Sequence, residues 1–141
     1  MNITLQRFGY PDTLIKEYEH WVMLLKPEQT TIGTLILAEK SEATHLGELS
    51  EASWAEFAQV SRDAERWTRE AFGVEKFNYL ALMMRDPNVH FHFVPRYSTP
   101  VEVDGETFVD ADWPNKTELG KIELSAEQLA TIQTKLRSIA H

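Results

Sequence analysis

Two histidines separated by a single residue are the strongest candidates for chemistry in this chain. His90 and His92 lie within residues 87–96, which read PNVHFHFVPR. Side chains alternate across a β-strand, so a strand here presents Asn88 and both imidazoles on one face and apolar side chains on the other. The apolar face can pack against a core while the imidazoles face an opening. We therefore predict that this segment is the chemical centre of the protein.

The polar residues of this segment suit distinct chemical roles. A neutral imidazole is a competent nucleophile near neutral pH, because its ordinary pKa of about 6.5 leaves one ring nitrogen free. His90 is thus able to attack phosphorus directly, while His92 donates a proton or a hydrogen bond to the departing group and Asn88 orients one of the rings. Arg96 follows Pro95, which ends the strand, and offers a forked cation to a phosphate or carboxylate.

A metal site is the main alternative interpretation of the same spacing. Pairs of imidazoles on a strand are common metal ligands, and His20 or His45 would supply a third. Spacing alone favours the metal site and the nucleophile equally, and a purely structural pair is the weakest option. His20 begins an apolar run and His45 sits in a polar connection, so we place both outside the site. The chain has no cysteine, which excludes thiolate chemistry and Cys-based metal sites.

The bulk composition indicates an ordinary globular protein. The chain has 141 residues, of which 43% are hydrophobic and 26% are charged, so we predict a single domain over residues 1–141. A formal net charge of −8 argues against binding to nucleic-acid backbones or anionic membranes. No run approaches the roughly 20 apolar residues of a membrane span, and the first residues lack a signal-like pattern, so we expect a cytoplasmic protein.

The segments that must position the histidines are predicted from their apolar patterns. Two apolar runs, at residues 20–25 and 33–38, favour a hairpin of two strands. Apolar residues then recur every three or four positions over residues 51–72. This spacing predicts a long helix with Ser50 as its N-cap and Gly73 as its stop.

The remaining segments predict two more strands, an arm and a final helix. Runs at 76–83 and 89–94 flank a turn-forming stretch and should pair antiparallel. Residues 98–120 lack a sustained period and are predicted as an irregular arm, whereas a capping-box pattern at 125–128 begins a helix over about 126–139. Together these elements predict an α+β fold, a mainly antiparallel sheet covered by helices on one side, with one long helix and a C-terminal helix. A parallel α/β fold is less favoured, because most neighbouring strands lack a helix of crossover length between them.

Residues 88–96, which read NVHFHFVPR, resemble the signature of the histidine-triad (HIT) nucleotide hydrolases and transferases. The order of hairpin, helix, strand and signature resembles the family's core over about residues 20–97, which implies a HIT-like fold. In that family the signature is His-x-His-x-His followed by two apolar residues, and the middle histidine becomes nucleotidylated. The resemblance implies that His90 is the nucleophile and that His92 contacts the bridging oxygen of the scissile phosphate. It puts Asn88 in the supporting first position, where the family has histidine.

The resemblance also suggests substrate-binding residues. Many relatives carry a Gly-Gln-Ser/Thr stretch just before the signature to hold the phosphate, and here residues 84–87 read MRDP. Arg85 is the positively charged residue of this stretch that would hold the phosphate instead. Asn78 matches a family asparagine near the ribose and phosphate. We take both as candidate substrate-binding residues.

A two-step reaction follows from the resemblance, which is to the bacterial diadenosine-polyphosphate-hydrolase-like branch. His90 displaces the leaving group from the α-phosphorus of a dinucleoside polyphosphate or nucleoside phosphoramidate, and water then releases the nucleoside monophosphate, with no metal or cofactor required. Family members form homodimers, so a homodimer is expected here. Two alternatives stay open: a non-catalytic nucleotide-binding or sensor protein on the same fold, and a metal-dependent enzyme that uses His90 and His92.

Overall fold

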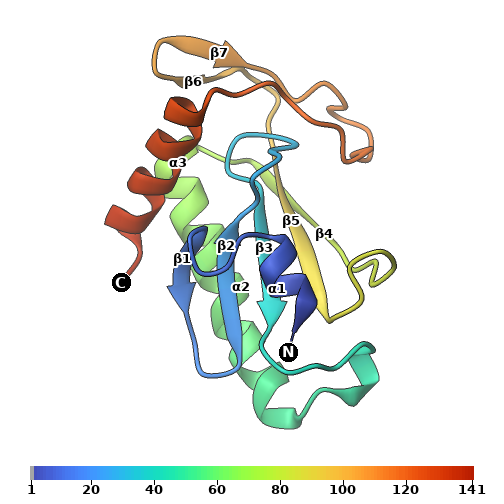
Figure 1. Cartoon of the computed structure of the whole chain (residues 1–141). Coiled ribbons are helices and arrows are strands. Elements are labelled where there is room, and N and C mark those ends of the chain that lie inside the picture. The colour runs from blue at the N-terminus through green and yellow to red at the C-terminus, as the bar shows by residue number, and fades with distance from the viewer. Residues whose placement is uncertain (1) are drawn as a thin grey trace.

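A five-stranded antiparallel sheet forms the centre of the structure, a computed structural model that describes residues 2–141. Its strands lie in the order β1-β2-β3-β5-β4 (Figure 1). β2 and β3 form the predicted hairpin, and β4 and β5 pair antiparallel as predicted. The strands span Leu14–Glu17 (β1), Trp21–Leu25 (β2), Leu35–Glu39 (β3), Lys76–Leu80 (β4) and His90–Arg96 (β5).

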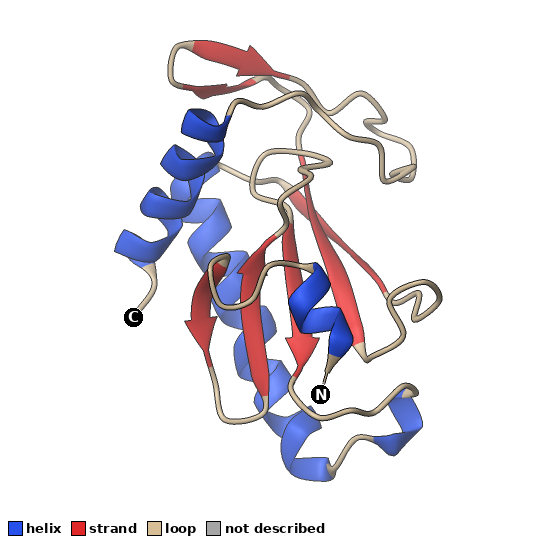
Figure 2. Cartoon of the chain, viewed as in Figure 1, coloured by secondary structure: helices blue, strands red, loops and turns tan. Residues whose placement is uncertain are grey.

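Helices cover both faces of this sheet (Figure 2). The long helix α2 (Glu51–Phe72) packs on one face through residues such as Trp67, and the C-terminal helix α3 (Ala126–Ile139) packs beside α2 and against β1. The short helix α1 (Ile3–Arg7) lies on the opposite face, where Leu5 packs against apolar side chains of β2 and β3. The α+β class with a long helix and a C-terminal helix is confirmed. The prediction of helices on one side only is wrong, because α1 was not predicted.

The two longer helices begin and end at the predicted residues, where local sequence signals mark their boundaries. The side chain of Ser50 accepts a hydrogen bond from the Ser53 N–H at the start of α2, which satisfies one of the free amides of the first turn. Gly73 follows α2 with a φ of 69°, a left-handed conformation that glycine adopts without a Cβ penalty. Ser125 and Gln128 form the predicted capping box of α3.

The arm after β5 is more regular than predicted. Val101–Val103 (β6) and Glu106–Phe108 (β7) form a separate two-stranded antiparallel sheet. The prediction of an irregular segment over residues 98–120 is therefore wrong for this part. The Asp104-Gly105 pair between the two strands has positive φ at both residues, and such a pair is a recognised hairpin signal. The sequence also left unpredicted β1 and a 3-10 helix, η1, at Leu46–Glu48.

A helix that crosses a membrane must be long and predominantly apolar. Within residues 2–141, no helix is both long enough and apolar enough to cross a bilayer.

Candidate active site

The strand β5 presents both candidate histidines on the face of the sheet that α1 covers. His90 is paired with Ala38 of β3, and His92 with Ile36 of β3 and Leu80 of β4. β5 therefore lies between two strands at this point. Only 2% of His90 and 7% of His92 is exposed. The alternation predicted from the sequence thus holds, but the imidazoles lie beneath a cover rather than in an open cleft.

A backbone carbonyl orients the ring of His90. Its Nδ1 lies 2.7 Å from the carbonyl oxygen of Asn88. A carbonyl oxygen only accepts hydrogen bonds, so Nδ1 carries the proton and donates it. Burial lowers the pKa of His90, which favours the neutral ring. The neutral ring with its proton on Nδ1 leaves a lone pair on Nε2, as a nucleophile requires.

His92 is held in an apolar environment next to His90. The two imidazole centroids are 5.1 Å apart, and the Phe8 ring of the α1 end lies 5.5 Å from the first and 5.9 Å from the second. Burial, together with the positive charge of the nearby Lys26 and the neighbouring His90, lowers the pKa of His92 to about 4. Its Nδ1 is buried and has no hydrogen-bond partner within residues 2–141. His92 is therefore neutral at physiological pH.

This lowered pKa predicts a loss of stability in mild acid. Above pH 6.5 the ring is neutral in both folded and unfolded chains; below that value the unfolded ring binds a proton, whereas the folded ring resists protonation down to about pH 4. The free energy of unfolding should therefore fall as the pH drops from 6.5 to 4. Allowing for partial solvation, we expect about 2 kcal/mol of that fall to depend on His92. Urea denaturation of the wild type and His92→Asn across this range measures the difference, and parallel curves would contradict it.

The side chain of Asn88 anchors α1 rather than a histidine ring. Its Oδ1 accepts hydrogen bonds from the N–H (3.2 Å) and the hydroxyl (3.0 Å) of Thr4, and its Nδ2 donates to the Glu42 carbonyl (3.2 Å). The backbone N–H of Asn88 donates to the Thr4 hydroxyl at 3.0 Å. Thr4 is completely buried. The backbone carbonyl of Asn88 thus orients His90. The side chain of Asn88 instead holds α1 in place through Thr4, and Phe8 follows the end of that helix.

These contacts predict that a histidine in place of Asn88 is harmful to the stability of this protein. An imidazole at position 88 cannot accept from both Thr4 groups and donate to Glu42 as the amide does, so Asn88→His leaves buried donors unpaired. We expect the free energy of unfolding to fall by about 2 kcal/mol, measured by urea denaturation. Because the carbonyl that orients His90 is retained, the substitution should bring no gain in catalytic rate. An unchanged unfolding midpoint would contradict the anchoring role.

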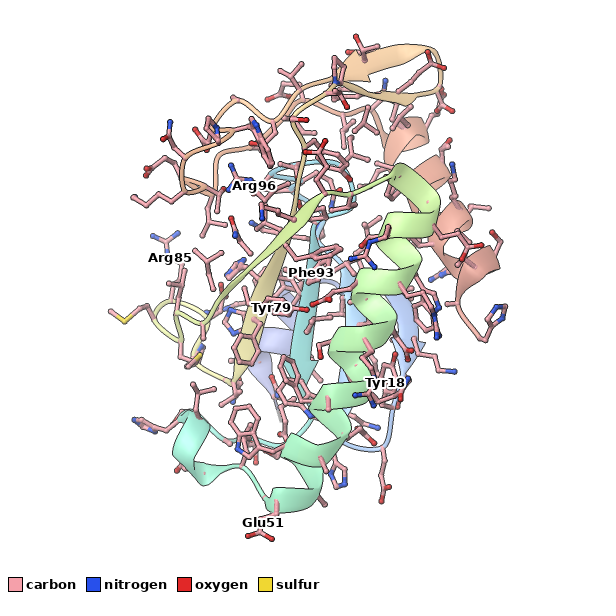
Figure 3. The ribbon with its side chains drawn as sticks, turned by 180° about the vertical axis from the view of Figure 1, so that it is seen from behind. Tyr18, Glu51, Tyr79, Arg85, Phe93 and Arg96 are labelled. Carbon is pink, nitrogen blue, oxygen red and sulfur yellow. The ribbon has the colours of Figure 1, made fainter. Side chains whose placement is uncertain are left out.

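Two pockets meet at His92. One has a volume of about 320 Å³ and is lined by His90 and His92 together with Leu82, Met84, Arg85 and Asp86. The other, of about 310 Å³, shares His92, Arg85 and Asp86 with the first but adds Lys26, Arg7 and Phe8 to its wall. His90 lines only the first of the two. The predicted substrate-binding residue Arg85 therefore lies beside the histidines, and its side chain extends outward from the β4–β5 loop (Figure 3).

Asn78 and Arg96 lie in a different cavity, of about 720 Å³, between β4 and the arm. Neither His90 nor His92 lines it. The Arg96 guanidinium forms a buried ion pair with Asp110 at 2.7 Å and donates to Asn78 Oδ1 at 2.6 Å. Figure 3 shows Arg96 beside the arm that carries Asp110. Arg96 is therefore committed to holding the arm, and the expected contact with a substrate phosphate or carboxylate does not fit its surroundings; binding by Asn78 stays a prediction.

The two further histidines considered as metal ligands lie at separate structural positions. The backbone N–H of His20 donates to Glu56 at 2.6 Å, and His45 is the N-cap of η1. Across residues 2–141, no three His, Asp or Glu side chains are grouped closely enough to hold a metal ion.

Three residues of the site were not found from the sequence: Thr4, Phe8 and Lys26. Thr4 lies in α1 and Phe8 is its C-cap residue, and the five residues of α1 are too few for a helical period to be recognised. Lys26 directly follows β2 and precedes Pro27, so no local pattern distinguishes it from an ordinary turn residue. All three approach the histidines only through long-range contacts, which a local pattern does not encode.

Comparison with known proteins identifies the fold. No family model matches the chain, and no curated protein matches it at a significant level. A histidine triad protein from Marinobacter aquaeolei VT8 has a similar structure, with 22% identity, a TM-score of 0.73, and coverage of 95% of this chain and 92% of that one. A histidine triad (HIT) protein from Sinorhizobium meliloti 1021 has 21% identity and a TM-score of 0.74, and the match covers 98% of this chain and 94% of that one. A hypothetical histidine triad nucleotide-binding protein from Sulfolobus tokodaii has 18% identity and a TM-score of 0.68, and the match covers 89% of this chain and 81% of that one. At these identities the likeness establishes a shared fold, which confirms the predicted HIT-like architecture.

Proposed function

We propose that this chain is a nucleotide-binding HIT protein and an enzyme of the diadenosine-polyphosphate-hydrolase-like kind, with His90 as its nucleophile. The observation that carries the proposal is the hydrogen bond from His90 Nδ1 to the Asn88 carbonyl. It leaves the Nε2 lone pair available on a buried, neutral ring. The substrate class is a nucleoside phosphate derivative, either a dinucleoside polyphosphate or a nucleoside phosphoramidate.

In the first step, His90 Nε2 forms a bond to the α-phosphorus. The bond from phosphorus to the leaving group breaks, and its electron pair departs with that group. A dinucleoside polyphosphate releases a phosphate anion, whereas the nitrogen of a phosphoramidate takes up a proton from solvent before it departs as an amine. The ring then carries phosphorus on Nε2 and a proton on Nδ1, so it is a cation. The Asn88 carbonyl, 2.7 Å from Nδ1, stabilises this cation by accepting its hydrogen bond. The neutral His92 donates a hydrogen bond to the bridging atom rather than a full proton, because its pKa lies near 4.

In the second step, water attacks the same phosphorus. An oxygen–phosphorus bond forms, the nitrogen–phosphorus bond breaks, and the electron pair returns to His90 Nε2. The proton lost by water passes to solvent, and a nucleoside monophosphate is released. The same intermediate would transfer the nucleotide if another acceptor replaced water, so hydrolase and transferase activity share this chemistry.

Trapping the intermediate tests the proposal directly. The protein is mixed with P1,P4-diadenosine tetraphosphate or adenosine 5′-phosphoramidate, quenched within milliseconds to seconds and digested for mass spectrometry. An adenylyl group on the peptide that contains His90, together with release of AMP, is the expected result. An adduct on another residue would reject the nucleophile assignment.

A nucleotide-binding protein without turnover is the second candidate. The observation that favours it is the deep burial of His90 beneath Phe8, since a nucleophile must reach its substrate. This candidate predicts saturable binding of AMP by calorimetry without release of AMP from either test compound. Turnover that disappears when His90 is replaced would exclude it.

The same proposal includes a homodimer. β4 is the edge strand of the sheet next to β5, so one row of its backbone groups is available for pairing with another chain. In the loop that follows β4, 47% of Leu82 and 82% of Met84 is exposed, although both are large apolar residues. Analytical ultracentrifugation should give a mass of twice 16.3 kDa. A monomer at micromolar concentration would contradict this part of the proposal.

A further inference from the structure

The side chain of Phe8 closes the space beside both candidate catalytic histidines. Its ring centroid lies 5.5 Å from that of His90 and 5.9 Å from that of His92. Only 2% of His90 is exposed, whereas Phe8 itself is partly exposed. A nucleophile must come within contact distance of the atom that it attacks. A substrate can therefore reach His90 from the side of α1 only if the Phe8 ring moves.

Movement of this ring would enlarge the space at the histidines. Phe8 lines the 310 Å³ pocket together with His92, whereas His90 lines only the neighbouring 320 Å³ pocket. Both volumes lie at the lower end of the range for pockets that enclose a small ligand. Because the Phe8 ring lies beside His90, its displacement would open the 310 Å³ pocket onto His90 and join the two pockets.

The beginning of α1 is fixed by buried contacts. Asn2 Nδ2 donates to the carbonyl oxygens of Glu39 at 3.0 Å and Ser41 at 2.7 Å. Thr4 is completely buried, and its hydroxyl lies 3.0 Å from both the side-chain oxygen and the backbone nitrogen of Asn88. Moving this end of the helix would leave buried polar groups without partners, which is costly. The start of α1 therefore stays in place.

The end of α1 is held to the β4–β5 loop by an exposed contact. The Arg7 guanidinium donates to the Arg85 carbonyl at 2.5 Å and lies 3.5 Å from the Asp86 carboxylate. The side chains of Arg7 and Asp86 are 48% and 25% exposed. Ion pairs that solvent can reach contribute little to stability. This contact can therefore break and reform while the rest of the fold stays intact.

We propose that Phe8 is a gate over His90, and that the contact between Arg7 and the β4–β5 loop holds this gate closed in the free protein. The inference rests on the proposed function, because the gate serves a substrate that must reach His90. Gly9 follows Phe8 with a φ of 85°, and the backbone freedom of glycine suits a pivot. The hydrogen bond from the Thr13 hydroxyl to the Phe8 carbonyl, at 2.7 Å, lies within the same N-terminal segment and can move with it.

Chemical access to His90 tests the gate without any substrate. Diethyl pyrocarbonate modifies neutral imidazoles, and the lowered pKa of His90 keeps its ring in that form near neutral pH. Tandem mass spectrometry gives the rate for each histidine. In the wild type, His90 should react at least about 10-fold more slowly than the exposed His45, because its reaction requires local opening. Arg7→Gln keeps the Phe8 ring but should raise the rate at His90 by about 5-fold, the effect of losing one exposed charged contact. Phe8→Ala should raise it by at least about 10-fold.

Matched variants separate gating from a general loosening of the fold. Arg62→Gln changes an exposed arginine of α2, and Phe72→Ala a partly buried phenylalanine at the end of that helix. Both should leave the rate at His90 unchanged. Arg7→Gln alters an exposed side chain, so its unfolding midpoint in urea should equal that of the wild type. Equal rates at His90 in the wild type and Arg7→Gln would overturn the gate, since a fixed cover does not respond to the loss of this contact.

AMP release separates the gate from the proposed reaction. A wild type whose His90 shows the expected rates with diethyl pyrocarbonate, but which releases no AMP from P1,P4-diadenosine tetraphosphate, would support the gate and overturn the reaction. AMP release by a wild type whose His90 reacts as fast as His45 would support the reaction and overturn the gate.

Discussion

Replacing His90 with asparagine is expected to lower kcat for AMP release from P1,P4-diadenosine tetraphosphate by at least about 1,000-fold, because the residue that forms the covalent bond is lost. Asparagine keeps a polar group at the buried position but offers no nucleophilic nitrogen. AMP release, followed by chromatography under single-turnover conditions, reports the loss of chemistry separately from product release.

Matched histidine variants sharpen this result. His92→Asn should cost less, about 100-fold, because it removes a hydrogen bond to the leaving group and not the nucleophile. His45→Asn changes an exposed histidine that caps η1 and should leave kcat unchanged. Circular dichroism and unfolding midpoints establish that each variant is folded. If His90→Asn kept more than a tenth of the wild-type rate, His90 would not be the nucleophile.

Replacing Asp110 with alanine is expected to cause the largest loss of stability, about 3–5 kcal/mol in the free energy of unfolding. The side chains of Arg96 and Asp110 are only 5% and 2% exposed, and they lie 2.7 Å apart. Without the carboxylate, the Arg96 guanidinium remains buried with its charge uncompensated, and the Tyr97 N–H loses its acceptor on Asp110 as well. Urea denaturation measures the effect.

An exposed ion pair provides the control for Asp110→Ala. Lys116 and Glu118 lie 2.9 Å apart in the same arm, with side chains 82% and 68% exposed. Glu118→Gln should therefore change the free energy of unfolding by less than about 0.5 kcal/mol. Equal small effects of the two substitutions would show that the Arg96–Asp110 pair does not stabilise the fold.

Sequence periodicity predicted most of the elements because each period is a local property. The spacing of apolar residues over Glu51–Phe72 defined α2, and Ser50 and Gly73 marked its two ends through contacts within a few residues. The short helix α1 and strand β1 escaped prediction, since four or five residues carry too little periodicity. The β6–β7 hairpin was missed even though its Asp104-Gly105 turn carried a usable signal.

The candidate site was only partly predictable for a related reason. The pair His90 and His92 was readable from its spacing. Arg85 lines a pocket with both histidines, while its binding of substrate stays a prediction. In the sequence, Arg96 was as good a candidate anion-binding residue as Arg85. In the structure its guanidinium forms an ion pair with Asp110 of the arm. Whether a charged side chain is free for a ligand depends on which distant segment packs against it, and that information is not in its neighbours.

The sequence by itself determined that His90 and His92 share one face of a strand, because alternation is a property of any extended backbone. Only the tertiary structure decided how these rings are tuned. α1 brings Phe8 over both rings, and burial favours their neutral forms. The carbonyl of Asn88 leaves the lone pair on Nε2 of His90, and Lys26, the residue after β2, lines a pocket with His92. Desolvation and charge pairing arise from contacts between segments far apart in the chain, and they convert a pair of histidines into a candidate nucleophile and its assistant.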